Sequence, residues 1–391
     1  MSLLKNKIKQ LVKDSHQEVV ANRRYLHSYP ELSFKEFETS KFIQQKLDAM
    51  GIPYQSGFVG TGVVGELKGN LPNSRCIALR ADIDALPIFE KNRVDYCSQN
   101  DGVMHACGHD VHTASLLGVA KILNETKNDW NGTIKLIFQP GEEKLPGGAS
   151  LMIQEGVLDS PKVEKIIGQH VSPELPTGVI GMRPGMFMAS SDEVYITVSG
   201  KGGHAALPKG TVNPIVVASK LVLDLYNRFD QEKDSPTIFS LGVVNGGTAG
   251  NIIPDEVQLA GTFRAMDENW RSKAHVIMRE ICDDVALKYT AICDLEIKVG
   301  YPFLKNDDNL TESCFNMAQS MISEDKVIEI PARMTSEDFS YYSQHVPACF
   351  YRLGVGFDGQ TTRGLHTSKF DINEDALLTS VEVMTWMAIN C

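Results

Sequence analysis

The alternation of apolar runs with helical patterns along the first 170 residues constrains the fold more than any other feature. Continuous apolar runs predict strands at residues 61–67, 75–83, 132–139 and 163–171. Amphipathic spacing predicts helices between them, at residues 35–50, 110–123 and 148–155. Strands that alternate with helices in this way predict an α/β fold with a mixed, largely parallel sheet and flanking helices.

The pattern changes near residue 187. From residue 192 to residue 301 the expected order is strand, helix, strand, strand, helix, strand, which is typical of a ferredoxin-like α+β unit. A strand at 348–356 and a closing helix at 374–388 then return to the first pattern. We therefore predict one domain formed by residues 1–186 and 302–391, interrupted by an inserted domain at residues 187–301.

Composition excludes several classes of partner. The 391 residues carry a formal net charge of −11, which disfavours nucleic acid because binding to phosphates needs a basic surface. No apolar run reaches the length of a membrane span, so we expect no membrane association. The first residues are broken by charges and lack the apolar core of a secretion signal, and the eight cysteines are scattered. A cytoplasmic protein with free thiols is the expectation.

Chemically active side chains follow the predicted strands at the point where each strand ends. In open α/β sheets, ligands bind beyond the carboxyl ends of the strands, so these residues are expected to meet at one edge. The segment "MHACGHDVHTA" precedes a helix and can reach the same edge. The residues at these strand ends or just beyond them are Asp82 and Asp84, Glu142 and Glu143, His170, and His366 in the loop after 348–356.

The segment at residues 104–114 is a candidate metal site. Cys107 and His109 lie two residues apart on a loop, and a thiolate and an imidazole at that spacing can share one metal ion. A polar helix cap is the alternative, but few partners would suit so many buried polar groups. Taken alone, Cys107 would more often be a small, buried apolar side chain than a metal ligand. We predict that His105 and His112 are not direct ligands.

The two adjacent glutamates can take different roles if their surroundings differ. One can bind a metal while the other takes a proton from an activated water. A solvated loop is the alternative interpretation of the glutamate pair. For His170 or His366 taken alone, the alternative is a structural role. The two aspartates fit the strand period of two, so both could face the same side. One of them could then orient a metal ligand or the base.

Eight motifs in this order resemble the metallopeptidase family M20. They are "RRYLHSYPELS", "RADIDALP", "MHACGHDVHTA", "FQPGEE", "GGHAALP", "GNIIPDEVQLAGTFR", "TSEDFSYY" and "GLHTSKF". Within that family the chain is similar to the amidohydrolase branch, which holds hippurate hydrolases, N-acyl amino acid deacylases and auxin-conjugate hydrolases. The resemblance implies a zinc-peptidase-like catalytic domain with an inserted lid and dimerisation domain.

The resemblance also implies a centre of two divalent metal ions per subunit, Zn or Mn, with Co or Ni as further candidates. Glu142 would be the general base, and Asp84 would orient the site. The implied metal ligands are Cys107, His109, Glu143, His170 and His366. Two positions depart from the branch, because Gly141 stands where alanine is common and Gln169 stands where leucine is common.

Three residues of the inserted domain complete the implied site. His204 resembles a histidine that reaches the partner subunit's site and stabilises the oxyanion. Asn251 and Arg264 resemble residues that grip the carboxylate of the substrate, and the planar fork of arginine suits that role. A homodimer and a small-molecule substrate with a free carboxylate are therefore expected.

The hypothesis is a metal-dependent hydrolase that cleaves the amide bond of N-acyl amino acids of the N-acetyl or benzoyl type. A dipeptidase or aminopeptidase with the same two-metal centre is the alternative. A metal-dependent binding protein is a weaker alternative, because Glu142, His204 and Arg264 are all present. A redox protein built on Cys107 is the weakest, because no CxxC partner exists.

Overall fold

The computed structural model describes residues 2–231, 233–357 and 363–391. The chain divides into two compact units. The first unit comprises Met1–Phe187, Lys305–Pro331 and Asp338–Cys391, and the second comprises Met188–Leu304 and Ala332–Glu337. The short segment 332–337 therefore packs with the second unit, although it follows the predicted insertion in the sequence.

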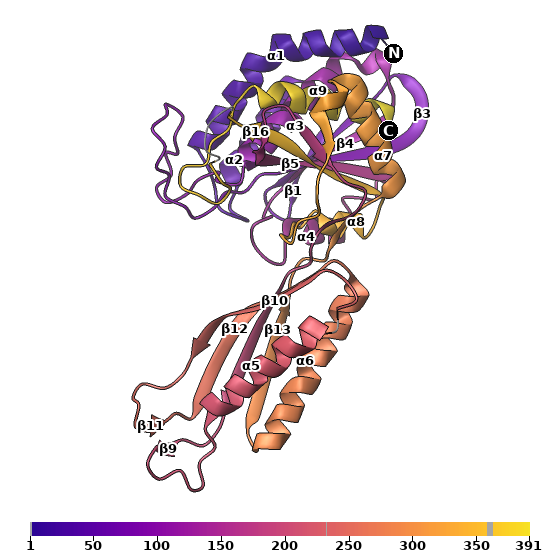
Figure 1. Cartoon of the computed structure of the whole chain (residues 1–391). Coiled ribbons are helices and arrows are strands. Elements are labelled where there is room, and N and C mark those ends of the chain that lie inside the picture. Colours follow the sequence, from indigo (N-terminus) through magenta and orange to yellow (C-terminus); the bar gives the residue numbers. More distant parts are fainter. Residues whose placement is uncertain (1, 232, 358–362) are drawn as a thin grey trace. The chain divides into compact units, whose positions relative to one another are not determined.

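The first unit is built on an eight-stranded sheet (Figure 1). Strand β3 pairs in parallel with β4 and β5, β16 pairs in parallel with β5, and antiparallel pairs lie toward both edges. The predicted α/β fold with a largely parallel sheet is confirmed. In sheet order, the strands are β1 (Tyr54–Phe58), β2 (Gly62–Lys68), β4 (Asn131–Gln139), β3 (Leu71–Asp82), β5 (Lys165–Pro176), β16 (Ala348–Gly356), β6 (Ile180–Met182) and β15 (Val327–Glu329).

Helices α1, α3 and α9 pack against one another, and α3 also contacts β3 and β5. Their apolar faces join the sheet in one core. Helix α7 was not predicted, although Asp307 caps it by accepting a hydrogen bond from the Leu310 amide. The helices are α1 (Ser2–Ser28), α2 (Phe37–Ala49), α3 (His109–Glu125), α4 (Gly148–Gln154), α7 (Asp308–Met321), α8 (Ser340–Ser343) and α9 (Ala376–Asn390), with short 3-10 turns at Lys127–Asp129 and Glu324–Lys326.

The second unit contains a four-stranded antiparallel sheet in the order β10-β12-β8-β13, and α5 and α6 pack together beside it. This is the ferredoxin-like arrangement that the sequence predicts. The elements are β8 (Asp192–Ser199), α5 (Pro214–Gln231), β10 (Thr237–Asn245), β12 (Glu256–Ala265), α6 (Glu268–Tyr289) and β13 (Ile292–Val299). Two small ladders complete the fold, β9 (Gly203–His204) with β11 (Ile252–Ile253), and β7 (Gly185–Met188) with β14 (Leu304–Asn306).

Among the described residues, no helix is long and apolar enough to cross a membrane.

Candidate metal centre

The five predicted metal ligands converge in the first unit from four separate segments. Cys107 and His109 stand at the start of α3, Glu143 follows β4, His170 lies within β5, and His366 lies in the loop after β16. The ligand atoms of Cys107, His109 and His170 all lie within 4.8 Å of one another, and so do those of Cys107, Glu143 and His366. Two overlapping groups that share the Cys107 thiol therefore form one site.

Gly108 allows this convergence at the start of α3. Its φ angle is +82°, and a Cβ atom there would lie 2.5 Å from Cγ2 of Val171. Only glycine combines the left-handed backbone with so close an approach to β5. The tight turn places Cys107 and His109 beside His170, the residue that precedes Val171.

The Cys107 thiol is the centre of the group. Its Sγ atom lies 3.3 Å from Nε2 of His170 and 3.3 Å from Nε2 of His366. Oε1 of Glu143 lies 3.2 Å from Nε2 of His366 and 4.0 Å from Nε2 of His109. Sulfur, imidazole nitrogen and carboxylate oxygen thus face one small volume, which is the donor set that Zn²⁺ and related divalent ions prefer.

Two of the imidazoles are held by hydrogen bonds on the far side of the ring. Nδ1 of His109 donates to the backbone oxygen of Asp84 at 2.9 Å, with its carboxylate at 3.2 Å. Nδ1 of His170 donates to the backbone oxygen of Val171 at 2.8 Å. This fixes the tautomer and leaves both Nε2 atoms with lone pairs toward the site, as in metal-ligating histidines. Asp84 also accepts from the Ser33 hydroxyl and the Glu143 amide, which supports its predicted orienting role.

The charges around these ligands favour a bound cation. Burial would lower the pKa of His109, but the carboxylates of Asp82 and Asp84 raise it to about 10. Burial, together with Glu143 and Glu142, raises the pKa of the Cys107 thiol well above its usual range. Nε2 of His109 and Oε1 of Glu143 are buried and make no hydrogen bond within the described residues. A divalent ion would neutralise the carboxylates and satisfy both atoms, so these residues fit a metal centre.

His105 lies in none of the ligand groups of the described residues, whereas His112 forms a third group with Asp82 and His109. Both ring nitrogens of His112 are engaged, because Nδ1 donates to Asp82 at 2.6 Å and Nε2 accepts from the Val171 amide at 3.0 Å. His105 is buried, and neither of its nitrogens makes a hydrogen bond in the part of the chain described. Asp110, the neighbour of His109, accepts from the buried Arg23 and lies in none of the ligand groups of the described residues.

Glu142 is buried beside the ligands, and one of its carboxylate oxygens lies within 4.8 Å of a carboxylate oxygen of Glu143 and of a ring nitrogen of His109. The preceding Gly141 has a φ angle of +63°, and a Cβ atom there would lie 2.4 Å from the ring of Phe34. The alanine that is common at this position in the amidohydrolase branch would therefore collide with Phe34. This departure is a local fit between two residues of this chain.

Glu36, the residue before α2, is a buried partner of the Gly141 loop that sequence reasoning missed. Its carboxylate accepts from the amides of Gly141 and Phe34 and from the Thr61 hydroxyl. Burial and the nearby Asp84 carboxylate raise the pKa of Glu36 to about 7. No local pattern marks this position, because its partner Gly141 lies 105 residues away.

The three predicted residues of the second unit do not come together within one copy. His204 on β9 pairs with Ile252 on β11, and the Asn251 carbonyl accepts from the amide of Ala205. Figure 1 shows β9 and β11 at one end of the second unit. Arg264 lies near the other end of β12 and donates to the backbone oxygen of Met334 at 3.1 Å. From Glu256 to Arg264 alone, the strand spans roughly 25 Å.

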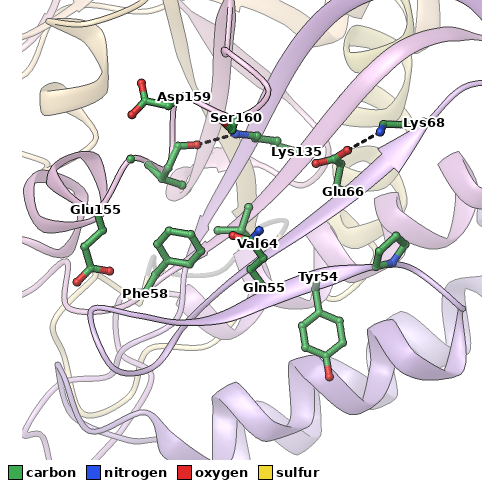
Figure 2. A pocket seen from close by; sticks show the side chains of 13 residues that line it. Tyr54, Gln55, Phe58, Val64, Glu66, Lys68, Lys135, Glu155, Asp159 and Ser160 are labelled. Atoms are coloured by element: carbon green, nitrogen blue, oxygen red, sulfur yellow. Dashed lines mark hydrogen bonds and ion pairs between the residues drawn. The ribbon is translucent and has the colours of Figure 1, made fainter.

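A separate pocket lies against β1, β2 and β4, and none of the predicted site residues lines it (Figure 2). Glu66 and Lys68 form an ion pair there, and the buried Lys135 donates to the Val157 carbonyl. The candidate metal centre is therefore distinct from this pocket.

A cysteine, three histidines and a glutamate beside a second glutamate, brought together in one α/β unit, are typical of the site of a metal-dependent hydrolase. The model of peptidase family M20/M25/M40 matches residues 78–390, and the chain belongs to this family. The predicted family and the predicted class of enzyme, a hydrolase of amide bonds, are confirmed.

Individual relatives cover nearly the whole chain. It is 38% identical over 380 residues to a thermostable carboxypeptidase of Saccharolobus solfataricus, covering 96% of this chain and 95% of that protein. It is 40% identical over 309 residues to an N-acyl-L-amino acid amidohydrolase of Geobacillus stearothermophilus, covering 78% and 83%. A solved structure from Bacillus subtilis, described as a dinuclear metal-binding peptidase of the M20 family, has a TM-score of 0.85 at 33% identity and covers 97% and 98%.

Proposed function

We propose that this protein hydrolyses the amide bond of N-acyl amino acids, with acetyl or benzoyl as the acyl group. The observation that carries the proposal is the buried Glu142 carboxylate, which lies within 4.8 Å of the ligand atoms of His109 and Glu143. The similarity to an amidohydrolase of N-acyl-L-amino acids supports it.

Two divalent ions would be held by Cys107, His109, Glu143, His170 and His366, and Zn or Mn suits this donor set best, with Co or Ni as alternatives. Bound there, they would lower the pKa of a water molecule and polarise the scissile carbonyl. Asp84 would hold His109 in the tautomer that presents Nε2 to the site.

Glu142 would act as the general base. Its carboxylate would take a proton from the attacking water and pass that proton to the departing amine. The place of Glu142 supports the role, since it lies next to the ligands yet belongs to neither group built on Cys107.

Two copies of the chain would complete the site. His204 would donate to the developing oxyanion, and Arg264 would bind the free carboxylate of the substrate through its planar fork. His204 and Asn251 lie at the opposite end of the second unit from Arg264, so one copy would supply Arg264 and the partner the other two. A homodimer in the cytoplasm is the form that we propose.

A peptidase is the second candidate, because one relative is a thermostable carboxypeptidase. Such an enzyme also cleaves an amide whose amino side carries a free carboxylate, so the same Arg264 contact would serve it. The two activities differ in the group on the carbonyl side of the amide bond, which is an acyl group for the amidohydrolase and an amino acid residue for the peptidase.

The experiment that decides is amine release from a panel of N-acetyl and N-benzoyl amino acids and of dipeptides. Each is measured with added Mn²⁺ or Zn²⁺ and again with a chelator. Chelator-sensitive release from the acyl amino acids is the expected result. Release from dipeptides alone would replace the proposal with the peptidase, and no release from a metal-loaded protein would refute both.

A further inference from the structure

Beneath the metal centre lies a buried guanidinium, that of Arg80 on β3, whose three nitrogens have three different partners. Nε donates to Oε1 of Gln139 at 2.9 Å, Nη1 to Oδ2 of Asp82 at 2.7 Å, and Nη2 to Oδ1 of Asp338 at 2.6 Å. All four side chains are fully buried. Only the planar fork of arginine offers charged donors in these three fixed directions, and a lysine could serve one or two of them.

One branch of this arrangement reaches the metal ligands. Oδ1 of Asp82 accepts from Nδ1 of His112 at 2.6 Å, and Nε2 of His112 accepts from the Val171 amide, next to His170. Oδ2 of Asp82 lies 3.6 Å from Nε2 of His109. The Asp82 carboxylate, which Arg80 binds, therefore lies between the imidazoles of His112 and His109. Through His112, its position connects α3 to β5.

The other branch reaches the proposed base. The Asp338 carboxylate accepts from Arg80, from the side-chain amide of Gln139 and from the backbone amide of Ala149. The backbone amide of the same Asp338 donates to Oε1 of Glu142 at 3.4 Å. Because its carboxylate is anchored, the Asp338 amide is held in place against Glu142.

We propose that Arg80 is a positioning residue that sets the Glu142 carboxylate against the metal-binding imidazoles, by holding Asp338 on one side and Asp82 on the other. The inference rests on the proposed function, in which Glu142 is the base. It assigns Arg80 no contact with the substrate. Arg80 affects the rate because a displacement of the Glu142 carboxylate by about 1 Å would lower kcat by roughly 100-fold.

Arg80→Lys tests the proposal, with Arg271→Lys as the matched control. Arg271 is also buried, and it pairs with Asp192 within the second unit. Each variant is assayed on an N-acetyl amino acid that the wild type cleaves, with its metal content and melting temperature measured. We expect Arg80→Lys to keep its metal and its KM within about threefold while kcat falls about 100-fold. The control should keep kcat.

Asp338→Asn provides a second test if Arg80→Lys does not fold. The substitution keeps the side-chain shape and the amide that faces Glu142, and it removes the charge that Arg80 holds. We expect kcat to fall about tenfold with KM unchanged, because the anchor of the amide is weakened. Either variant, folded and metal-loaded with kcat within threefold of the wild type, would overturn the proposal.

A readout without turnover separates this inference from the proposed function. The Nδ1 proton of His112, held by Asp82, should give a low-field proton NMR signal that His112→Gln removes. We expect Arg80→Lys to shift or abolish the signal and Arg271→Lys to leave it in place. An unchanged signal in Arg80→Lys would overturn the role of Arg80. If the wild type hydrolyses no substrate, the proposed function fails while the NMR result still decides the role of Arg80.

Discussion

His109 and His204 are both predicted to serve the same reaction, yet the chain holds them in opposite ways. His109 is fully buried, its Nδ1 donates to Asp84, and its Nε2 faces other ligands. His204 is exposed on a two-residue strand, and its Nδ1 accepts from the nearby Ala206 amide. In the first unit, the buried contacts of one copy hold His109 in place, whereas within the described residues the His204 ring forms a hydrogen bond only with a neighbouring backbone amide.

The largest expected effect on activity is that of a substitution at the buried metal centre. Glu142→Gln keeps the shape of the side chain and removes the base, so kcat should fall by about 10³-fold or more, within the range of general-base catalysis. Metal content should not change, because Glu142 is absent from the ligand groups built on Cys107. Steady-state kinetics and metal analysis of the same sample measure both. A variant with near-normal kcat would remove Glu142 from the mechanism.

The next effect tests whether His204 acts in a second copy. His204→Ala should lower kcat by about 10²–10³-fold, which is typical for the loss of one oxyanion donor. Mixing inactive His204→Ala with inactive Glu142→Gln should then restore about a quarter of wild-type activity, because half of the dimers are mixed and each has one intact site. Unfolding and refolding the mixture together allows the exchange.

Recovery in that mixture is the outcome that distinguishes the two arrangements. If each copy used its own His204, every site in a mixed dimer would carry one defect and no activity would return. Mixing each variant with itself provides the control for refolding.

Arg264 should show a smaller effect that depends on the substrate. Arg264→Gln removes a charged hydrogen bond to the substrate carboxylate, worth about 1.5–3 kcal/mol, so KM should rise by roughly 10- to 100-fold. The same variant assayed on an N-acetyl amino acid amide, which lacks the carboxylate, should differ little from the wild type. An equal loss on both substrates would contradict the carboxylate contact.

The smallest effect concerns the fit between Gly141 and Phe34. Gly141→Ala places a methyl group against the Phe34 ring and strains a backbone with positive φ, so the Glu142 loop must shift. We expect kcat to fall about tenfold, and Phe34→Leu in the same chain to restore part of it, since the clash is relieved. No recovery in the double variant would show that backbone strain, and not the ring, causes the loss.

The sequence predicts the buried region better than the second unit, for a physical reason. Strands of a parallel sheet are buried on both faces and read as continuous apolar runs, so the ends of β3 and β4 could be located together with Asp84 and Glu142. The end of β5 was predicted too early, because this strand continues past His170 to Pro176. The resemblance supplied the ligand set. Neither source found the partners of Arg80, because Asp338 lies 258 residues away and only the folded sheet brings it near.

For the second unit, sequence could name residues but not their arrangement. His204, Asn251 and Arg264 stand in recognisable motifs, but motifs carry no distances. The separation along β12 emerges only from the strand register, in which Ile238 pairs with Arg264 and Ser199 with Glu256. This separation supports the proposed use of a second copy, which the resemblance of His204 already implied.

Metal dependence is tested by stepwise metal removal from the wild-type protein, with metal content and hydrolysis of an N-acetyl amino acid measured in the same samples. We expect activity to fall with metal content and to return when Zn²⁺ or Mn²⁺ is added back. We also expect Cys107→Ser, which replaces the sulfur shared by the two ligand groups built on Cys107, to bind the metal more weakly. Full hydrolysis by a protein stripped of metal would show that the metal centre is not required for the reaction.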